Sequence, residues 1–333
     1  MLKKITSLIF FVLAISACET MDGSDENGPE ITKNMNFNKA YKLAVKHGDV
    51  TISSFKDRVR ANKEWKLLFK SSRKDLLENY NSMEISELQR VASLYHLTTS
   101  TISPEILKNL LRSNRAGARK VGLQMAGLRP SPEVAKVLEN TLSLAIIENR
   151  EKVFYTPELA HAVKANNVSS AYSFIKQGLL ATGDDEFAKT LSSLSAERAS
   201  YDFMDYISQA TVEDLRQLNQ TSINVYTCLV IFRFFLDNEL PVAHPQIGKI
   251  FAFSISRNRA LADMAVLLLE NNISSYREEF VYALAKEPMR IQMAFIENAV
   301  RSPTSNIKLL LTDLRGVTAF SEVREEINSF RQL

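Results

Sequence analysis

The chain has 333 residues, and its 41 Lys and Arg side chains nearly balance 38 Asp and Glu. A charge so close to neutral gives no global signal for binding nucleic acid. The 10 glycines and 9 prolines are fewer than a large β-protein or a Gly-rich nucleotide-binding fold would need, so the composition favours helices.

The first residues have the layout of a bacterial export signal. Lys3 and Lys4 precede an apolar run over residues 5–15, which is too short for a membrane crossing of roughly 20 residues. The run ends in Ile15-Ser16-Ala17-Cys18, and this sequence resembles the lipobox of bacterial lipoproteins. The resemblance implies a signal peptide over 1–17, cleavage before Cys18 and acylation of its thiol, for instance with palmitate. The alternatives are an ordinary signal peptide with a chance cysteine, and a buried N-terminal helix.

Lipidation would place the mature chain in the cell envelope. In the lipoprotein family an Asp after the lipidated cysteine retains the protein in the inner membrane, so Glu19 favours the outer membrane, facing the periplasm; the inner membrane is the alternative. Without Lys3 and Lys4, the 41 basic residues fall to 39 against 38 acidic ones. Residues 18–36 are rich in acidic residues and poor in apolar ones, which predicts the acylated Cys18 followed by a flexible tether.

Residues 37–100 are predicted to form a basic helical region. Within residues 39–74, eleven Lys and Arg side chains face three acidic ones. Lys63, Lys66 and Lys70 are spaced by three and four residues, so a helix aligns them on one face. With Arg73 and Lys74 they form a candidate contact for anionic lipid head groups or an anionic glycan. The alternative is a solvated helix face whose charge is balanced elsewhere in the fold.

Residues 101–333 carry repeated helix-start signals: Ser103-Pro104-Glu105, Ser131-Pro132-Glu133, Glu287-Pro288 and Ser302-Pro303. A serine caps free amide groups, and the missing N–H of a proline costs nothing in the first turn. Residues 131–145 show apolar side chains at steps of three and four, and the last helix is expected to place Phe320, Val323, Ile327 and Phe330 on one face. No alternating strand pattern is evident, so the expected fold class is all-α.

Residues 118–142 resemble a HEAT repeat. Arg119 lies early in the first expected helix, Gly127 lies at its end, and Leu138 and Leu142 point inward from the second. A weaker copy begins 144 residues later, where Asn258-Arg259-Ala260 matches Asn114-Arg115-Ala116. The resemblance implies a HEAT-like α-solenoid of stacked helix pairs over 101–333, with an extended concave surface that binds polypeptides. The alternative is an irregular helical domain without true repeats.

No catalytic or metal-binding motif is present. The histidines His47, His96, His161 and His244 lack partners at ligand spacing. Asp184-Asp185 after Gly183 is interpreted as a turn that starts a helix rather than as a cation site. Cys228 lies in an apolar run and is predicted to be a buried, inert side chain.

The sequence therefore predicts a lipid-anchored periplasmic interaction scaffold or assembly factor of the bacterial cell envelope. It would be non-catalytic, need no cofactor, and bind envelope proteins through the concave surface. Two alternatives stay open. One is an envelope lipoprotein that contacts peptidoglycan or lipopolysaccharide through residues 39–74. The other is a cell-wall-acting enzyme of an unrecognised class, which would need a polar cleft that gathers His96, His161 or several carboxylates.

Overall fold

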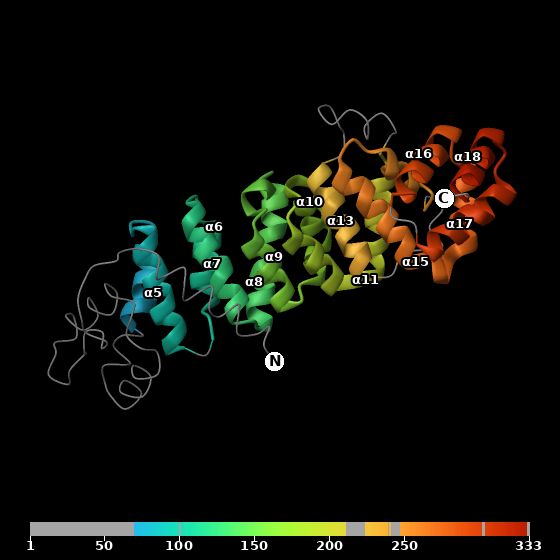
Figure 1. Cartoon of the computed structure of the whole chain (residues 1–333). Coiled ribbons are helices and arrows are strands. Elements are labelled where there is room, and N and C mark those ends of the chain that lie inside the picture. Colours follow the sequence, from blue (N-terminus) through green and yellow to red (C-terminus); the bar gives the residue numbers. More distant parts are fainter. Residues whose placement is uncertain are drawn as a thin grey trace, which may run out of the picture. The chain divides into compact units, whose positions relative to one another are not determined.

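The computed structural model describes residues 70–99, 101–210, 224–238, 240, 247–301 and 304–331. Within these ranges the fold is all-α, as the sequence predicts, and no strand is present (Figure 1). The predicted signal peptide, Cys18, the tether, and Lys63 and Lys66 of the basic stretch lie outside the described residues. The chain divides into two compact units, residues 1–141 and 142–333. None of the described helices has both the length and the apolar character that a membrane crossing requires.

The first unit contains a short π-helix and a set of packed α-helices. Residues 70–74 are helical and lead into η1 (Asp75–Asn79), which is followed by α5 (Ile85–Thr98), α6 (Pro104–Arg112), α7 (Ala116–Leu128) and the start of α8 (Pro132–Ile147). Helix α7 packs against α5 and α6, and η1 packs against the same two helices. The described part of the predicted basic region therefore shares a core with the helices that follow it.

The predicted helix starts at Pro104 and Pro132 are confirmed. The Oγ of Ser131 accepts a hydrogen bond from the backbone N–H of Val134 at 3.3 Å, as a capping serine should. Ser103 occupies the same position before α6, but its side chain makes no capping hydrogen bond. Together the two prolines fix where α6 and α8 begin.

Two arginines stabilise the turns between helices of the first unit by donating hydrogen bonds to backbone carbonyl oxygens. The Arg115 guanidinium donates to the carbonyl oxygens of Tyr80, Asn81 and Met83 at 3.1, 2.7 and 2.7 Å. The buried Arg119 donates to the carbonyl oxygens of Ser113 and Asn114, both at 2.9 Å. These carbonyls lie in the turns between η1 and α5 and between α6 and α7, so the arginines provide hydrogen-bond donors to backbone groups outside the helices.

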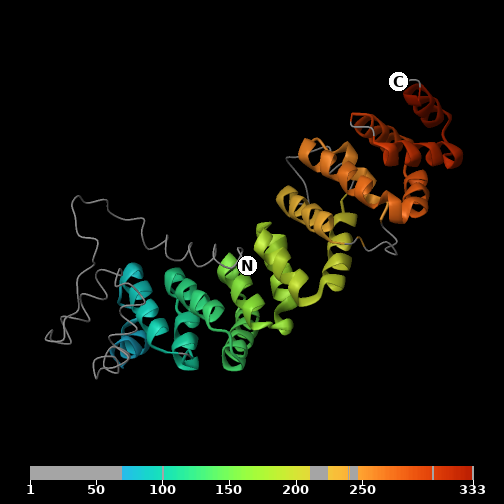
Figure 2. The ribbon, with the colours of Figure 1, turned by 60° about the horizontal axis from the view of Figure 1, so that its bottom comes forward.

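The second unit is a succession of helices that follow one another in chain order (Figure 2). After the end of α8 they are η2 (Glu151–Phe154), α9 (Pro157–Asn166), η3 (Ser169–Ala171), α10 (Tyr172–Thr182), α11 (Asp185–Ser208), α13 (Val225–Asp237), α14 (Lys249–Ala252), η4 (Phe253–Ile255), α15 (Arg259–Lys286), α16 (Met289–Ala299), α17 (Ser305–Val317) and α18 (Ser321–Arg331). Helix α11 is kinked at Ser195 and α15 at Tyr276.

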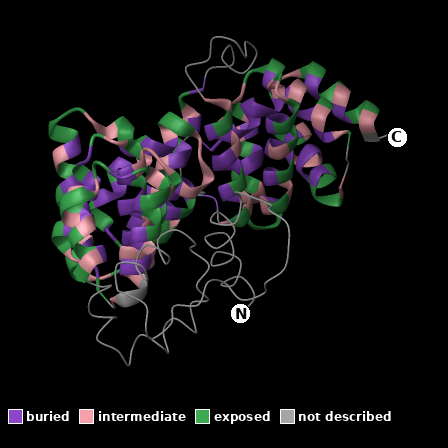
Figure 3. Cartoon of the chain, turned by 90° about the vertical axis from the view of Figure 1, so that its left-hand side faces the viewer, coloured by how far each residue is buried: buried purple, intermediate pink, exposed green. Residues whose placement is uncertain are grey.

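The contacts within the second unit arrange these helices in two rows. Helices α9, α11, α13, α15 and α17 pack successively against one another in the first row. In the second row, α16 packs against α14, η4 and α18. Neighbours along the chain, such as α15 with α16 and α17 with α18, connect the rows. Buried and exposed residues recur along these helices (Figure 3).

Several local predictions in the second unit are confirmed. Gly183 has φ +67° and ends α10, and the Asp184 side chain caps α11 by accepting from the backbone N–H of Glu186 at 2.9 Å. This is the predicted turn. Helix α16 begins at Met289, directly after Pro288. Helix α17 begins at Ser305 with Thr304 as its cap, while Ser302 and Pro303 lie outside the described residues.

The core of the second unit is rich in phenylalanine. Phe251 is fully buried and meets the rings of Phe280 and Phe295 edge to face, with centroids 6.1 and 5.2 Å away. Cys228 is also fully buried, within α13, and burial raises the pKa of its thiol to about 12. The prediction of a buried cysteine is therefore confirmed. In α18, Val323 and Ile327 are buried on one face, as predicted.

Candidate binding groove

The predicted basic site is described only in part. Lys70, Arg73 and Lys74 are exposed, and Lys74 forms a 3.8 Å ion pair with Glu78. Both partners of that pair are more than 60% exposed, so it contributes little to stability. Because Lys63 and Lys66 lie outside the described residues, the alignment of Lys63, Lys66 and Lys70 on one face stays a prediction.

The described histidines do not form a site. His96 is half-buried on α5, and His161 is exposed on α9. Among the residues that the structure describes, no group of three or more His, Cys, Asp or Glu side chains is placed to hold a metal ion. His47 and His244 fall outside those residues.

A polar cluster connects α10 and α11. Lys176 Nζ lies 2.6 Å from Asp202 Oδ1, and the Arg198 guanidinium lies 4.0 Å from the centroid of the Tyr172 ring. Burial, together with the neighbouring Asp202 carboxylate, raises the pKa of the Tyr172 phenol, so it stays protonated at physiological pH. These interactions join two neighbouring helices, and we assign them a packing role.

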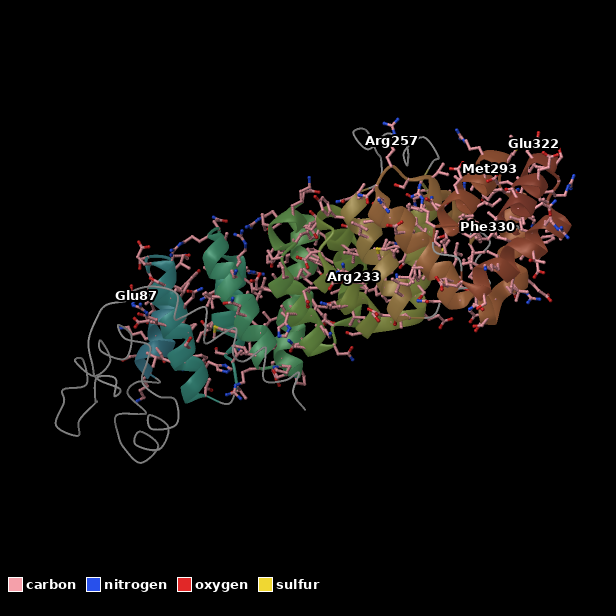
Figure 4. All side chains as sticks on the ribbon, viewed as in Figure 1. Glu87, Arg233, Arg257, Met293, Glu322 and Phe330 are labelled. Carbon is pink, nitrogen blue, oxygen red and sulfur yellow. The ribbon has the colours of Figure 1, made fainter. Side chains whose placement is uncertain are left out.

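A candidate site among the described residues is a groove in the second unit, which we call the arginine groove. It has a volume of about 580 Å³ and lies between α16 and the connection from η4 to α15. Its lining residues are Ser254, Ile255, Ser256, Arg257, Arg259, Ala262, Arg290, Met293, Ala294, Glu297, Asn298 and Arg301. Figure 4 labels Arg257, which projects outward from the connection, and Met293, which lies on α16.

Polar contacts hold the two walls of the arginine groove in place. Asn298 on α16 donates a side-chain hydrogen bond to the carbonyl oxygen of Ser254, which ties the walls together. On the opposite wall, Asn258 caps α15 by accepting from the N–H of Leu261 at 3.2 Å. The Ser256 Oγ in turn accepts from the N–H of Asn258 at 3.2 Å. These hydrogen bonds fix the backbone conformation of the connection between η4 and α15.

The charge of the groove is strongly unbalanced. Arg257, Arg259, Arg290 and Arg301 are all exposed and face a single carboxylate, that of Glu297. Arg259 pairs with Asp263 at 3.6 Å, whereas Arg257, Arg290 and Arg301 form no ion pair within the described ranges. Guanidinium groups without a partner are suited to bind oxyanions, because they present several N–H donors in a planar fork.

The lining of the groove also includes apolar side chains. Ala262 is buried, and Ile255, Met293 and Ala294 are half-buried. Ser254 is 1% exposed, and its Oγ has no hydrogen-bond partner among the described atoms. A groove lined by both charged and apolar side chains can hold a ligand that has both anionic and apolar groups.

The sequence analysis missed this site. From the sequence, residues 258–260 are interpreted only as a weaker copy of the HEAT-like segment, and no pattern distinguishes Arg290 or Arg301. No family model, curated protein or solved structure matches this chain.

Proposed function

We propose that this protein is a non-catalytic interaction scaffold or assembly factor of the bacterial cell envelope, anchored by lipid at Cys18 and binding other proteins through its helical body. The observation that carries this proposal is the arginine groove, where three arginines that have no ion-pair partner among the described residues lie beside apolar side chains. A surface of this kind can bind a polypeptide.

A HEAT-like stack of helix pairs is part of the proposal. The two rows of helices in the second unit, each packed on its neighbours in the same row, support it. The resembling segment 118–142 falls on the consecutive helices α7 and α8. Its echo also lies at a helix start, offset by one residue, because Arg115 precedes α7 and Asn258, the counterpart of Asn114, precedes α15. Stacked pairs of this type bury faces that one pair cannot bury alone, and they leave extended surfaces for partners.

The anchor rests on the lipobox-like sequence ending at Cys18. Two or three acyl chains would hold the protein at a membrane, since each buried methylene contributes about 0.8 kcal/mol. The acidic Glu19 favours the outer membrane, with the inner membrane as the alternative. The acidic residues 19–36 would then separate the helical body from the lipid surface.

Affinity capture from intact envelopes tests the proposal. The wild-type chain and a Cys18→Ser variant are expressed with labelled palmitate, and captured proteins are identified by mass spectrometry. We expect label on the wild type only, and a reproducible set of envelope proteins captured with the acylated form. Wild-type protein without label would overturn the anchor, and label without any captured protein would overturn the scaffold function.

A second candidate function is contact with peptidoglycan or lipopolysaccharide through the basic stretch. The exposure of Lys70, Arg73 and Lys74 favours it, because their charges are accessible to an anionic surface. Changing Lys63, Lys66 and Lys70 to Gln should then abolish the envelope association that does not depend on the lipid anchor. Variants that fractionate and capture partners like the wild type would exclude this function.

A further inference from the structure

We propose that the arginine groove binds an acidic polypeptide segment in an extended conformation. This inference rests on the proposed scaffold function and deepens it by naming the chemistry of the partner. Charge complementarity, the length of the groove and its mixed lining carry the argument.

Charge complementarity identifies the ligand as anionic. Four arginines and one glutamate line the groove, and only Arg259 among those arginines has a carboxylate partner within the described residues. All four side chains are exposed, so a ligand can reach their guanidinium groups without rearranging the core. Carboxylates bind guanidinium groups through paired N–H···O contacts, which gives an acidic partner both affinity and orientation.

The length of the groove favours an extended segment over a compact anion. Arg290, Met293, Ala294 and Glu297 are separated by steps of three and four, so they share one face of α16. From Arg290 to the end of the helix this face is about 14 Å long at 1.5 Å per residue, and Arg301 lies just beyond Ala299. An extended chain rises about 3.3 Å per residue, so four or five residues span that face.

The rest of the lining also suits a polypeptide. Met293 and Ile255 offer half-buried apolar surface to non-polar side chains, and methionine adapts its shape to different partners. Glu297 lies on the same face of α16 as Arg290, where it would repel a dense anion such as a phosphate cluster. Its carboxylate can instead accept hydrogen bonds from the backbone N–H groups of an extended segment. The mixed lining therefore favours acidic residues spaced along a chain over a phosphate.

The test is fluorescence anisotropy with the full-length chain purified in a zwitterionic detergent. The probe is a fluorescein-labelled peptide of twelve residues that alternates glutamate with leucine and serine. A peptide of the same design with lysine in place of glutamate measures non-specific binding. Pyrophosphate and vesicles of phosphatidylglycerol serve as competing anions of other classes.

The charge-reversing pair Arg290→Glu and Arg301→Glu tests the groove, and Arg257→Glu tests the opposite wall. Arg233→Glu is the matched control, since Arg233 is an exposed arginine of the same unit on α13, outside the groove (Figure 4). We expect the acidic peptide to bind, the double variant to weaken binding tenfold or more, and Arg257→Glu to weaken it severalfold. Arg233→Glu should leave it within twofold, and raised salt should weaken it because the charges are exposed.

Three results would overturn the inference. The first is an acidic peptide that does not bind or binds no better than the lysine peptide. The second is an equal loss of peptide affinity in Arg233→Glu, because the effect would then come from net charge alone. The third is tight binding of pyrophosphate or vesicles at the groove without binding of the peptide.

A further variant converts Glu19, Asp22, Asp25, Glu26 and Glu30 to amides. If this variant binds the peptide much more tightly than the wild type, the groove binds the chain's own acidic segment rather than a partner, and the inference is overturned. None of these measurements depends on acylation, so a negative result here can be distinguished from a negative result of the envelope capture.

Discussion

We predict that Gln292 stabilises two connections between helices next to the arginine groove, the one from α15 to α16 and the one from α17 to α18. It is fully buried on α16, and its Nε2 donates to the carbonyl oxygens of Ala285 at 3.1 Å and Glu287 at 2.7 Å. Its Oε1 accepts from the buried Thr318 hydroxyl at 2.8 Å. Gln292→Leu keeps a similar volume but leaves two carbonyls and one hydroxyl without these partners. Since each such hydrogen bond contributes roughly 0.5–1.5 kcal/mol net, we expect a loss of about 2–4 kcal/mol.

Hydrogen–deuterium exchange is the suitable assay, because a chain of this size need not unfold in a single step. Peptides from α16 to α18 should exchange faster in Gln292→Leu, while peptides from α9 to α11 should not change. Thr318→Val removes one of the three bonds and should cost about 1 kcal/mol. In the double variant the losses should not add, because both changes remove the same Gln292–Thr318 contact. If α16 to α18 exchange as slowly in Gln292→Leu as in the wild type, this account of the Gln292 contacts is refuted.

Three further predictions concern the second unit. Phe251→Ala should lower the free energy of unfolding by about 3–5 kcal/mol in urea titrations, because it empties part of the aromatic core; an unchanged midpoint would contradict the packing. Gly183→Ala should cost about 1–2 kcal/mol, since its φ is positive, whereas Gly316→Ala in α17 should be neutral or stabilising by about 0.5–1 kcal/mol, with no atom within 4 Å of the new Cβ. The Cys228 thiol should resist iodoacetamide at pH 8 until the protein is unfolded. Because its folded pKa is raised, stability should fall as the pH rises above the ordinary thiol range, and rapid labelling of the folded protein would refute its burial.

Local sequence signals predict much of this fold. Ser131-Pro132 and Asp184 begin helices where the sequence analysis expects them, because capping groups act within one turn. The buried face of α18 follows from apolar spacing alone. The kinks at Ser195 and Tyr276 are not expected from the sequence, because no proline precedes them and the only local signals are Ser195 and Ser275, a residue type that can cap a helix. Such a serine can lie within a helix or start a new one, and packing between successive helices, which a single sequence does not specify, decides between the two.

The candidate site was beyond sequence reasoning for the same reason. Arg257 and Arg259 are separated by about thirty residues from Arg290, and each alone is indistinguishable from a solvated surface arginine. Packing of η4 against α16 brings the two groups to one groove, and Asn298 fixes the contact through the Ser254 carbonyl. The sequence analysis instead selected Lys63, Lys66 and Lys70 because their periodicity is visible along the chain.

Photo-crosslinking in living cells tests most directly whether the protein binds envelope proteins through the arginine groove. A benzophenone amino acid replaces Met293 in the lining of the groove or, as a control, Arg233 on α13. The account predicts that the probe at position 293 crosslinks to acidic segments of envelope proteins, mapped by mass spectrometry, and that Arg290→Glu with Arg301→Glu abolishes these products. The same products at both positions, or none at position 293, would contradict it.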